Sequence, residues 1–115
     1  MPDDRTYFFD MLNAARKIKE FTHDMPQAEF DGSELHQNAV VRLIQVIGEA
    51  ARLVSNATKA ANPEIEWRRI SGMRNAVIHR YFNIDLLIVW EVISRDIDIL
   101  IAQPETLLEQ RDDEG

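Results

Sequence analysis

Hydrophobic residues recur every three or four positions along most of this 115-residue chain, which is the spacing of one face of an α-helix. The pattern predicts four helices, which span about residues 4–22, 33–56, 64–81 and 85–104. No segment has the alternating apolar and polar pattern of a convincing strand. Because the connections between the helices are short, the chain is predicted to be all-α, folded as an up-and-down bundle of antiparallel helices.

Residues that cap helices stand at the beginnings of three of these ranges. Asp3 or Asp4 is expected to cap the first helix, and Ser33 and Asp85 are expected to cap the second and the fourth. The connections are marked by residues that break helices, namely Pro26, Asp31-Gly32 and Asn62-Pro63.

Three sites inside the predicted helices interrupt the helical pattern. Gly48 costs about 1 kcal/mol relative to Ala in a helix interior, so we expect another backbone to pack closely against it. Ser71-Gly72 is a potential kink in the third helix. Pro104 is expected to end or bend the fourth helix.

Length and composition set the class of protein. The length fits a single domain that spans residues 1–115, with 45% hydrophobic residues. A monomer of this size leaves much apolar surface in contact with water, which favours a homodimer. The absence of cysteine excludes disulfides and thiolate metal sites and fits a reducing cytoplasm. Without a signal peptide or an apolar run of spanning length, the chain is expected to be cytoplasmic, with no membrane partner.

The chain has a formal net charge of −7, but several of its positive charges are concentrated in one segment. A strongly acidic protein is not expected to coat nucleic acid through bulk electrostatics. However, Arg68, Arg69, Arg74 and Arg80 crowd into one short segment. We therefore predict a local basic patch in which Arg68, Arg69 and Arg80 contact RNA phosphates.

The three histidines differ in their surroundings. His23 and His36 are expected to be surface residues, and no pair of histidines has the spacing of a helical metal site. No metal and no cofactor are therefore expected. On a continuous helix His79 shares a face with Asn75 but lies about 140° from Arg74. Convergence of Arg74 with His79 then requires the reach of the arginine, a distorted helix end or a second subunit.

These groups can cleave RNA without a metal ion. An imidazole can take the proton of a 2′-hydroxyl or supply one to the leaving oxygen, and an arginine can hold the phosphate and stabilise its developing charge. One Arg74 and one His79 supply half of a two-sided acid–base mechanism, and a symmetric dimer would supply the rest. On spacing alone a structural role is the stronger interpretation, because Arg and His in a last helical turn commonly interact with free carbonyl groups.

The wider context favours the chemical interpretation. The segment WRRISGMRNAVIHRY, residues 67–81, resembles the HepT-like toxins of the HEPN superfamily. Their signature is Arg, four residues, His, one residue and Tyr, usually with Asn after the Arg, and Arg74, Asn75, His79 and Tyr81 match it. The segment IGEAA at residues 47–51 and Asp85 with Val89-Trp90 match as well, so the resemblance extends over most of the chain, to about Ala102.

The resemblance implies a four- to five-helix HEPN bundle that forms a homodimer. It implies that the chain is the toxin of a type VII-like toxin–antitoxin system, a metal-independent endoribonuclease with Arg74 and His79 as the catalytic pair and Asn75 in support. The implied partner is an antitoxin of the MNT nucleotidyltransferase type, which transfers AMP to Tyr81 and so silences the toxin. The alternative is a catalytically inactive HEPN subunit that only binds such a nucleotidyltransferase.

Overall fold

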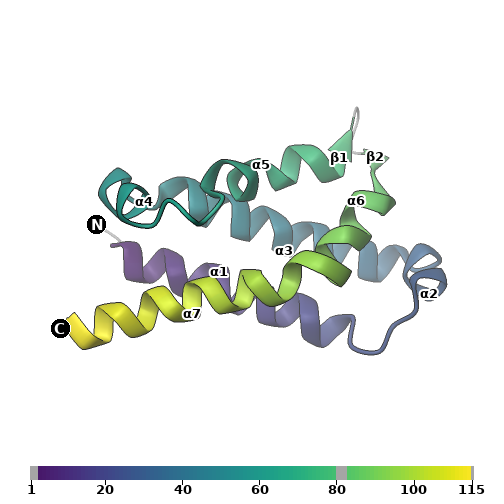
Figure 1. Ribbon diagram of the computed structural model, residues 1–115. Coiled ribbons are helices and arrows are strands. Elements are labelled where there is room, and N and C mark those ends of the chain that lie inside the picture. Colours follow the sequence, from purple (N-terminus) through teal and green to yellow (C-terminus); the bar gives the residue numbers. More distant parts are fainter. Residues whose placement is uncertain (1–2, 80–82, 115) are drawn as a thin grey trace.

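The computed structural model describes residues 3–79 and 83–114 and has the predicted all-α fold (Figure 1). The long helices are α1 (Asp4–Phe21), α3 (Glu34–Leu53), α5 (Trp67–Val77) and a last helix that begins as α6 (Leu86–Glu91), passes through a π-helical turn (Val92–Asp96) and continues as α7 (Ile97–Glu114). The short helices α2 (Gln27–Asp31) and α4 (Asn56–Ala61) were not predicted and lie in the connections.

The long helices pack side by side. Helix α3 packs against α1 on one side and α5 on the other, α7 packs against α1, and α6 closes over α3 and α5. The residues that share this interior and are fully buried include Phe8, Ile18, Phe30, Val40, Ile44, Ile47, Val77 and Val89. Because one side chain from α2 belongs to this set, that short helix covers one end of the core.

The predicted caps are confirmed. The side chain of Asp3 accepts a hydrogen bond from the backbone of Thr6 at 3.2 Å, and Ser33 and Asp85 cap α3 and α6 in the same way. Asp4 has a different role. Its buried carboxylate accepts hydrogen bonds from the backbone N–H of Ser55 at 2.8 Å and from the hydroxyls of Ser55 and Thr58, so it ties α1 to the beginning of α4.

The expectation for Gly48 is also confirmed. A Cβ atom at Gly48 would lie 3.2 Å from the carbonyl oxygens of both Ile70 and Ser71. The glycine therefore allows the backbones of α3 and α5 to approach each other closely, which fixes how the two helices are aligned.

The predicted third helix, residues 64–81, is wrong at both ends. Helix α5 begins at Trp67 and ends at Val77, and Ile78 is extended. Strand β1 (Ile78–His79) pairs with β2 (Asn83–Ile84) in an antiparallel hairpin, with His79 opposite Asn83. The carbonyl oxygen of Val77 accepts a hydrogen bond from the backbone N–H of Asp85 at 2.7 Å, so a residue after β2 satisfies a free carbonyl group of the helix end. The expectation that no strand is present fails at this hairpin.

Two further expectations concern helix interiors. Helix α5 runs through Ser71-Gly72 as one regular helix. Pro104 does not end its helix, because α7 continues to Glu114. The ring of Pro104 is fully buried, and this burial offsets part of the cost of the backbone hydrogen bond that proline cannot make. Within the described ranges no helix has both the length and the apolar character required to cross a membrane.

Candidate functional site

Arg74 and Asn75 lie together in the last turn of α5. The buried face of this helix is formed by Trp67, Ile70, Met73 and Val77. Because these residues face the core, the side chains of Arg74 and Asn75 are exposed. The guanidinium of Arg74 donates a hydrogen bond from Nη1 to Oδ1 of Asn75 at 3.4 Å. This hydrogen bond keeps the side chains of Arg74 and Asn75 next to each other on the surface.

His79 does not lie on the helix. Because α5 ends at Val77, the expectation that His79 shares a helical face with Asn75 is wrong. The backbone of His79 lies in β1, where it pairs with Asn83. The chain leaves the helix between Arg74 and His79, so the separation of about 140° expected on a continuous helix does not apply. Arg80 and Tyr81 lie outside the described residues.

A groove between α3 and α5 adjoins Arg74. It has a volume of about 380 Å³ and is lined by Arg42, Gln45, Glu49, Arg52, Ser71, Arg74 and Asn75. Sequence reasoning missed the members from α3. Their spacing of three, four and three residues was available as a signal, because it places them in one stripe along the helix. The side of α5 that this stripe meets depends on the tertiary contact at Gly48.

The groove contains one close ion pair. Arg52 binds both carboxylate oxygens of Glu49, at 2.6 Å from Nη2 and 3.1 Å from Nε. These hydrogen bonds hold the pKa of Glu49 below its ordinary value and raise the pKa of Arg52. Arg42 and Arg74 make no ion pair with another described residue. The groove therefore has an excess of positive charge although the chain as a whole is acidic.

Arg69 lies on another side of α5. Its Nη2 atom is 2.7 Å from Oδ2 of Asp96, and its Nη1 atom is 3.4 Å from Oε2 of Glu66. The hydrogen bond to Asp96 is the main cause that raises the pKa of Arg69. Arg68 is exposed and has no ion pair within the described part of the chain. The structure does not bring Arg69 together with Arg74.

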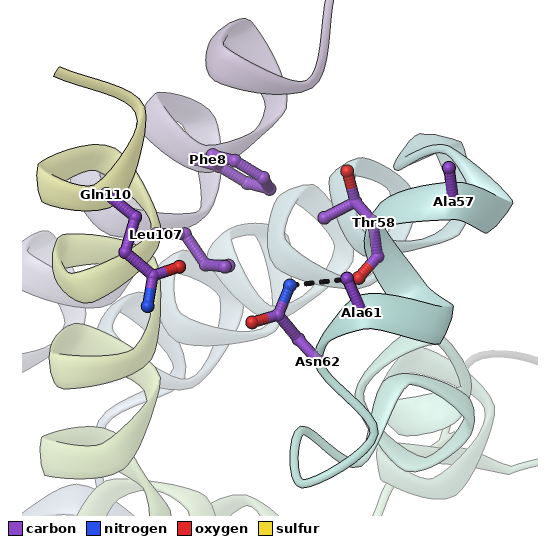
Figure 2. Close-up of a pocket in the computed structure, with 7 residues that line it drawn as sticks. All are labelled: Phe8, Ala57, Thr58, Ala61, Asn62, Leu107 and Gln110. Carbon is purple, nitrogen blue, oxygen red and sulfur yellow. Dashed lines mark hydrogen bonds between the residues drawn. The ribbon is translucent and has the colours of Figure 1, made fainter. Parts of the chain in front are cut away.

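A larger hollow lies on another part of the molecule and is lined by side chains of a different kind. It measures about 450 Å³ and is lined by Phe8, Ala57, Thr58, Ala61, Asn62, Leu107 and Gln110, from or beside α1, α4 and α7 (Figure 2). Its polar groups are amides and a hydroxyl, and the amide of Asn62 donates a hydrogen bond to the carbonyl oxygen of Thr58 at 2.9 Å. Because none of these side chains can exchange a proton near neutral pH, this hollow is not suited to acid–base chemistry.

The fold and the site together define a class. An all-α bundle carries an exposed Arg-Asn pair at a helix end, a histidine in the strand that follows, and a basic groove beside them, which is a set of groups suited to a phosphate-containing substrate. Among the residues that the structure describes, no three His, Cys, Asp or Glu side chains gather to hold a metal ion.

Comparison with known proteins identifies the family. The model of the family described as "Ribonuclease HepT-like" matches residues 11–107. The chain is 35% identical over 103 residues to a protein of Thermococcus cleftensis named "Probable ribonuclease HepT", and the match covers 90% of this chain and 94% of that protein. It is 34% identical over 95 residues to a Methanocaldococcus jannaschii protein whose name describes it as a putative RNase, with 83% and 87% covered. The chain belongs to the HepT-like ribonuclease family of the HEPN superfamily. No solved structure matches it.

Proposed function

We propose that this chain is a metal-independent endoribonuclease of the cytoplasm, acting as one domain over residues 1–115, in which Arg74 and His79 are the catalytic pair. The observation that carries the proposal is the exposed Arg74–Asn75 pair at the end of α5, with His79 following in β1, in a member of a ribonuclease family. Asn75 acts as a positioning residue for the guanidinium of Arg74.

The proposed reaction uses the 2′-hydroxyl of the RNA as its nucleophile. The imidazole of His79 takes the proton of this hydroxyl, and the oxygen attacks the neighbouring phosphorus. The bond from phosphorus to the 5′-oxygen breaks, and that oxygen takes up a proton. The products are a 2′,3′-cyclic phosphate and a 5′-hydroxyl. Arg74 holds the non-bridging oxygens and stabilises the charge that develops on them.

The two proton transfers favour a dimer. One neutral imidazole can accept a proton, but a second, protonated group is required to supply one to the leaving oxygen at the same time. We propose a C₂ homodimer in which the ends of the two α5 helices face each other, because this brings two Arg74–His79 pairs to one phosphate.

The catalytic assignment is tested by substitution with matched controls. His79→Ala and Arg74→Ala should each lower the rate of RNA cleavage by about 10²–10⁴-fold, the usual effect of removing an acid–base group. The controls are His23→Ala and Arg16→Ala, because both residues are exposed and lie away from α5. Helicity and melting temperature should change little in all four variants. Full cleavage by the His79→Ala variant would refute the assignment of His79. A wild-type protein that does not cleave RNA would instead favour a catalytically inactive subunit that binds a nucleotidyltransferase.

We further propose that the chain is the toxin of a toxin–antitoxin pair and that an MNT-type nucleotidyltransferase silences it by transferring AMP from ATP to Tyr81. The support is the family membership and the position of Tyr81 two residues after His79 in the sequence. The new phosphate would compete with the phosphates of RNA for Arg74.

Intact mass after incubation with ATP and the partner tests the modification. One or more AMP additions should appear on the wild type and be absent from Tyr81→Phe, which should remain toxic when the partner is present. Tyr7, the other tyrosine, is partly buried on α1 and serves as the control in Tyr7→Phe. Full neutralisation of Tyr81→Phe by the partner would refute control by modification and would leave binding of the antitoxin as the explanation.

A further inference from the structure

The α3 side of the groove next to Arg74 is a stripe of polar residues that the proposed reaction does not use. The members from α3 are Arg42, Gln45, Glu49 and Arg52. Arg42 and Arg52 are ten residues apart, so the stripe is about 15 Å long at the rise of an α-helix. With Arg74, the groove contains three arginines and one glutamate, which leaves two net positive charges on a chain with a formal charge of −7.

The contact at Gly48 fixes where each arginine lies along the groove. Helix α3 runs from α2 to α4 and α5 runs from α4 to β1, so the two helices are antiparallel (Figure 1). Gly48 meets Ser71. Three residues further along α5, Arg74 is therefore level with Gln45, three residues earlier on α3. Arg42 lies about one turn beyond, toward β1, and Arg52 lies on the opposite side of Gly48, toward α4.

We infer that this groove binds the RNA strand on both sides of the cleaved phosphate, with Arg42 contacting a phosphate on the β1 side and Arg52 contacting one on the α4 side. This inference rests on the proposed ribonuclease function and names residues that hold its substrate. Single-stranded RNA fits the observations because a row of separated cations beside a catalytic arginine matches a row of phosphates, and an acidic protein needs such a local row to hold RNA.

Arg42 and Arg52 differ in whether another side chain already binds the guanidinium group. Arg42 is exposed and has no ion pair with a described residue, so its guanidinium can meet a phosphate directly. Arg52 is held by both oxygens of Glu49, and a phosphate must compete with that carboxylate. Glu49 therefore weakens RNA binding at the α4 side of the groove, and its removal should strengthen it.

The experiment measures the binding of a mixed-sequence single-stranded oligoribonucleotide at several salt concentrations, with every variant made in the full-length His79→Ala protein so that the RNA stays intact. Arg42→Gln should weaken binding several-fold and reduce the slope of log K against log salt by about 0.7, the loss of one phosphate contact. Arg42→Lys should keep most of the slope. Glu49→Gln should bind RNA more tightly and steepen the slope. Arg16→Gln, an exposed arginine on α1, should bind as the parent does.

The outcomes separate this inference from the proposed function. If the parent binds RNA and the wild type cleaves it, but Arg42→Gln and Glu49→Gln bind with the affinity and salt slope of the parent, the groove is not the RNA site and the ribonuclease remains. The groove is also excluded as the RNA site if Arg42→Gln leaves RNA binding intact and instead abolishes binding of the nucleotidyltransferase. If the wild type neither binds nor cleaves RNA, both proposals fall.

Discussion

At the scale of the residue, the arginines of this chain differ in what they contact. Arg69 is held by Asp96 and Glu66, and Arg52 is held by Glu49. Arg42 and Arg74 line the groove without an ion pair to another described residue. We therefore expect Arg42 and Arg74 to bind a phosphate more strongly than Arg52 and Arg69 do, because a guanidinium that already binds a carboxylate must give up that contact.

The contact of Arg69 with Asp96 predicts a role in stability. Arg69→Ala should lower the free energy of unfolding by about 1 kcal/mol and the melting temperature by a few degrees, because Asp96 is only 16% exposed and would lose its hydrogen-bond partner. Arg68→Ala, the neighbouring substitution, is the control and should leave the melting temperature unchanged. Thermal unfolding followed by circular dichroism measures both variants. An equal loss of stability in the two would contradict the assignment.

At the scale of the element, the packing of α3 on α5 depends on a missing side chain. Gly48 and Gly72 are both helical glycines, but a Cβ at Gly48 would meet two carbonyl oxygens at 3.2 Å, whereas a Cβ at Gly72 would meet nothing within 4 Å. The first glycine is required by close packing, and the second has no such requirement within the described chain.

These two glycines give a matched pair of predictions. Gly72→Ala should stabilise the protein by up to about 1 kcal/mol, because Ala has the higher helix propensity. Gly48→Ala should lose that gain and lower the melting temperature, because the backbones of α3 and α5 must separate by a few tenths of an ångström. Denaturant unfolding of the two variants measures the difference. A Gly48→Ala protein more stable than the Gly72→Ala protein would contradict the packing.

The elements also show what sequence patterns can and cannot predict. Hydrophobic spacing and local caps predicted the long helices, because both depend on residues that are near in the chain. The end of α5 was missed because Val77-Ile78 continues the apolar pattern, while the helix ends through a bond from Asp85, eight residues later. Helix α4 was missed because it is short and has no buried residues, so it leaves no hydrophobic pattern, although Ser55 caps it locally.

The candidate site was predictable to a similar degree. Arg74 and Asn75 were identified from the motif, and the structure places them together on the surface at the end of α5. Arg42 was missed because the spacing of the polar stripe on α3 does not show which neighbouring helix the stripe meets. Its importance depends on the alignment that Gly48 gives to α3 and α5, which is a tertiary contact. Arg69 was grouped with Arg74 because the two are near in sequence, although they lie on different sides of the helix.

At the scale of the whole molecule, the proposed mechanism requires two subunits. A mixture of Arg74→Ala and His79→Ala proteins should recover part of the cleavage activity that each lacks alone, because a mixed dimer brings one intact arginine and one intact histidine to its shared site. The recovery should be only partial, because the mixed dimer lacks the second histidine. RNA cleavage by the separate and mixed proteins, with light scattering to establish the dimer, measures this. A monomer that cleaves RNA at the wild-type rate would contradict the shared site.

The metal-independent mechanism is tested most sharply by the identity of the RNA ends that the purified wild-type protein produces in excess EDTA. We predict that cleavage persists in EDTA, that each cut leaves a 2′,3′-cyclic phosphate and a 5′-hydroxyl, and that the His79→Ala protein yields neither. Activity that disappears in EDTA and returns with a divalent cation, or products that carry a 5′-phosphate and a 3′-hydroxyl, would contradict a reaction in which the 2′-hydroxyl attacks and His79 and Arg74 provide the catalysis.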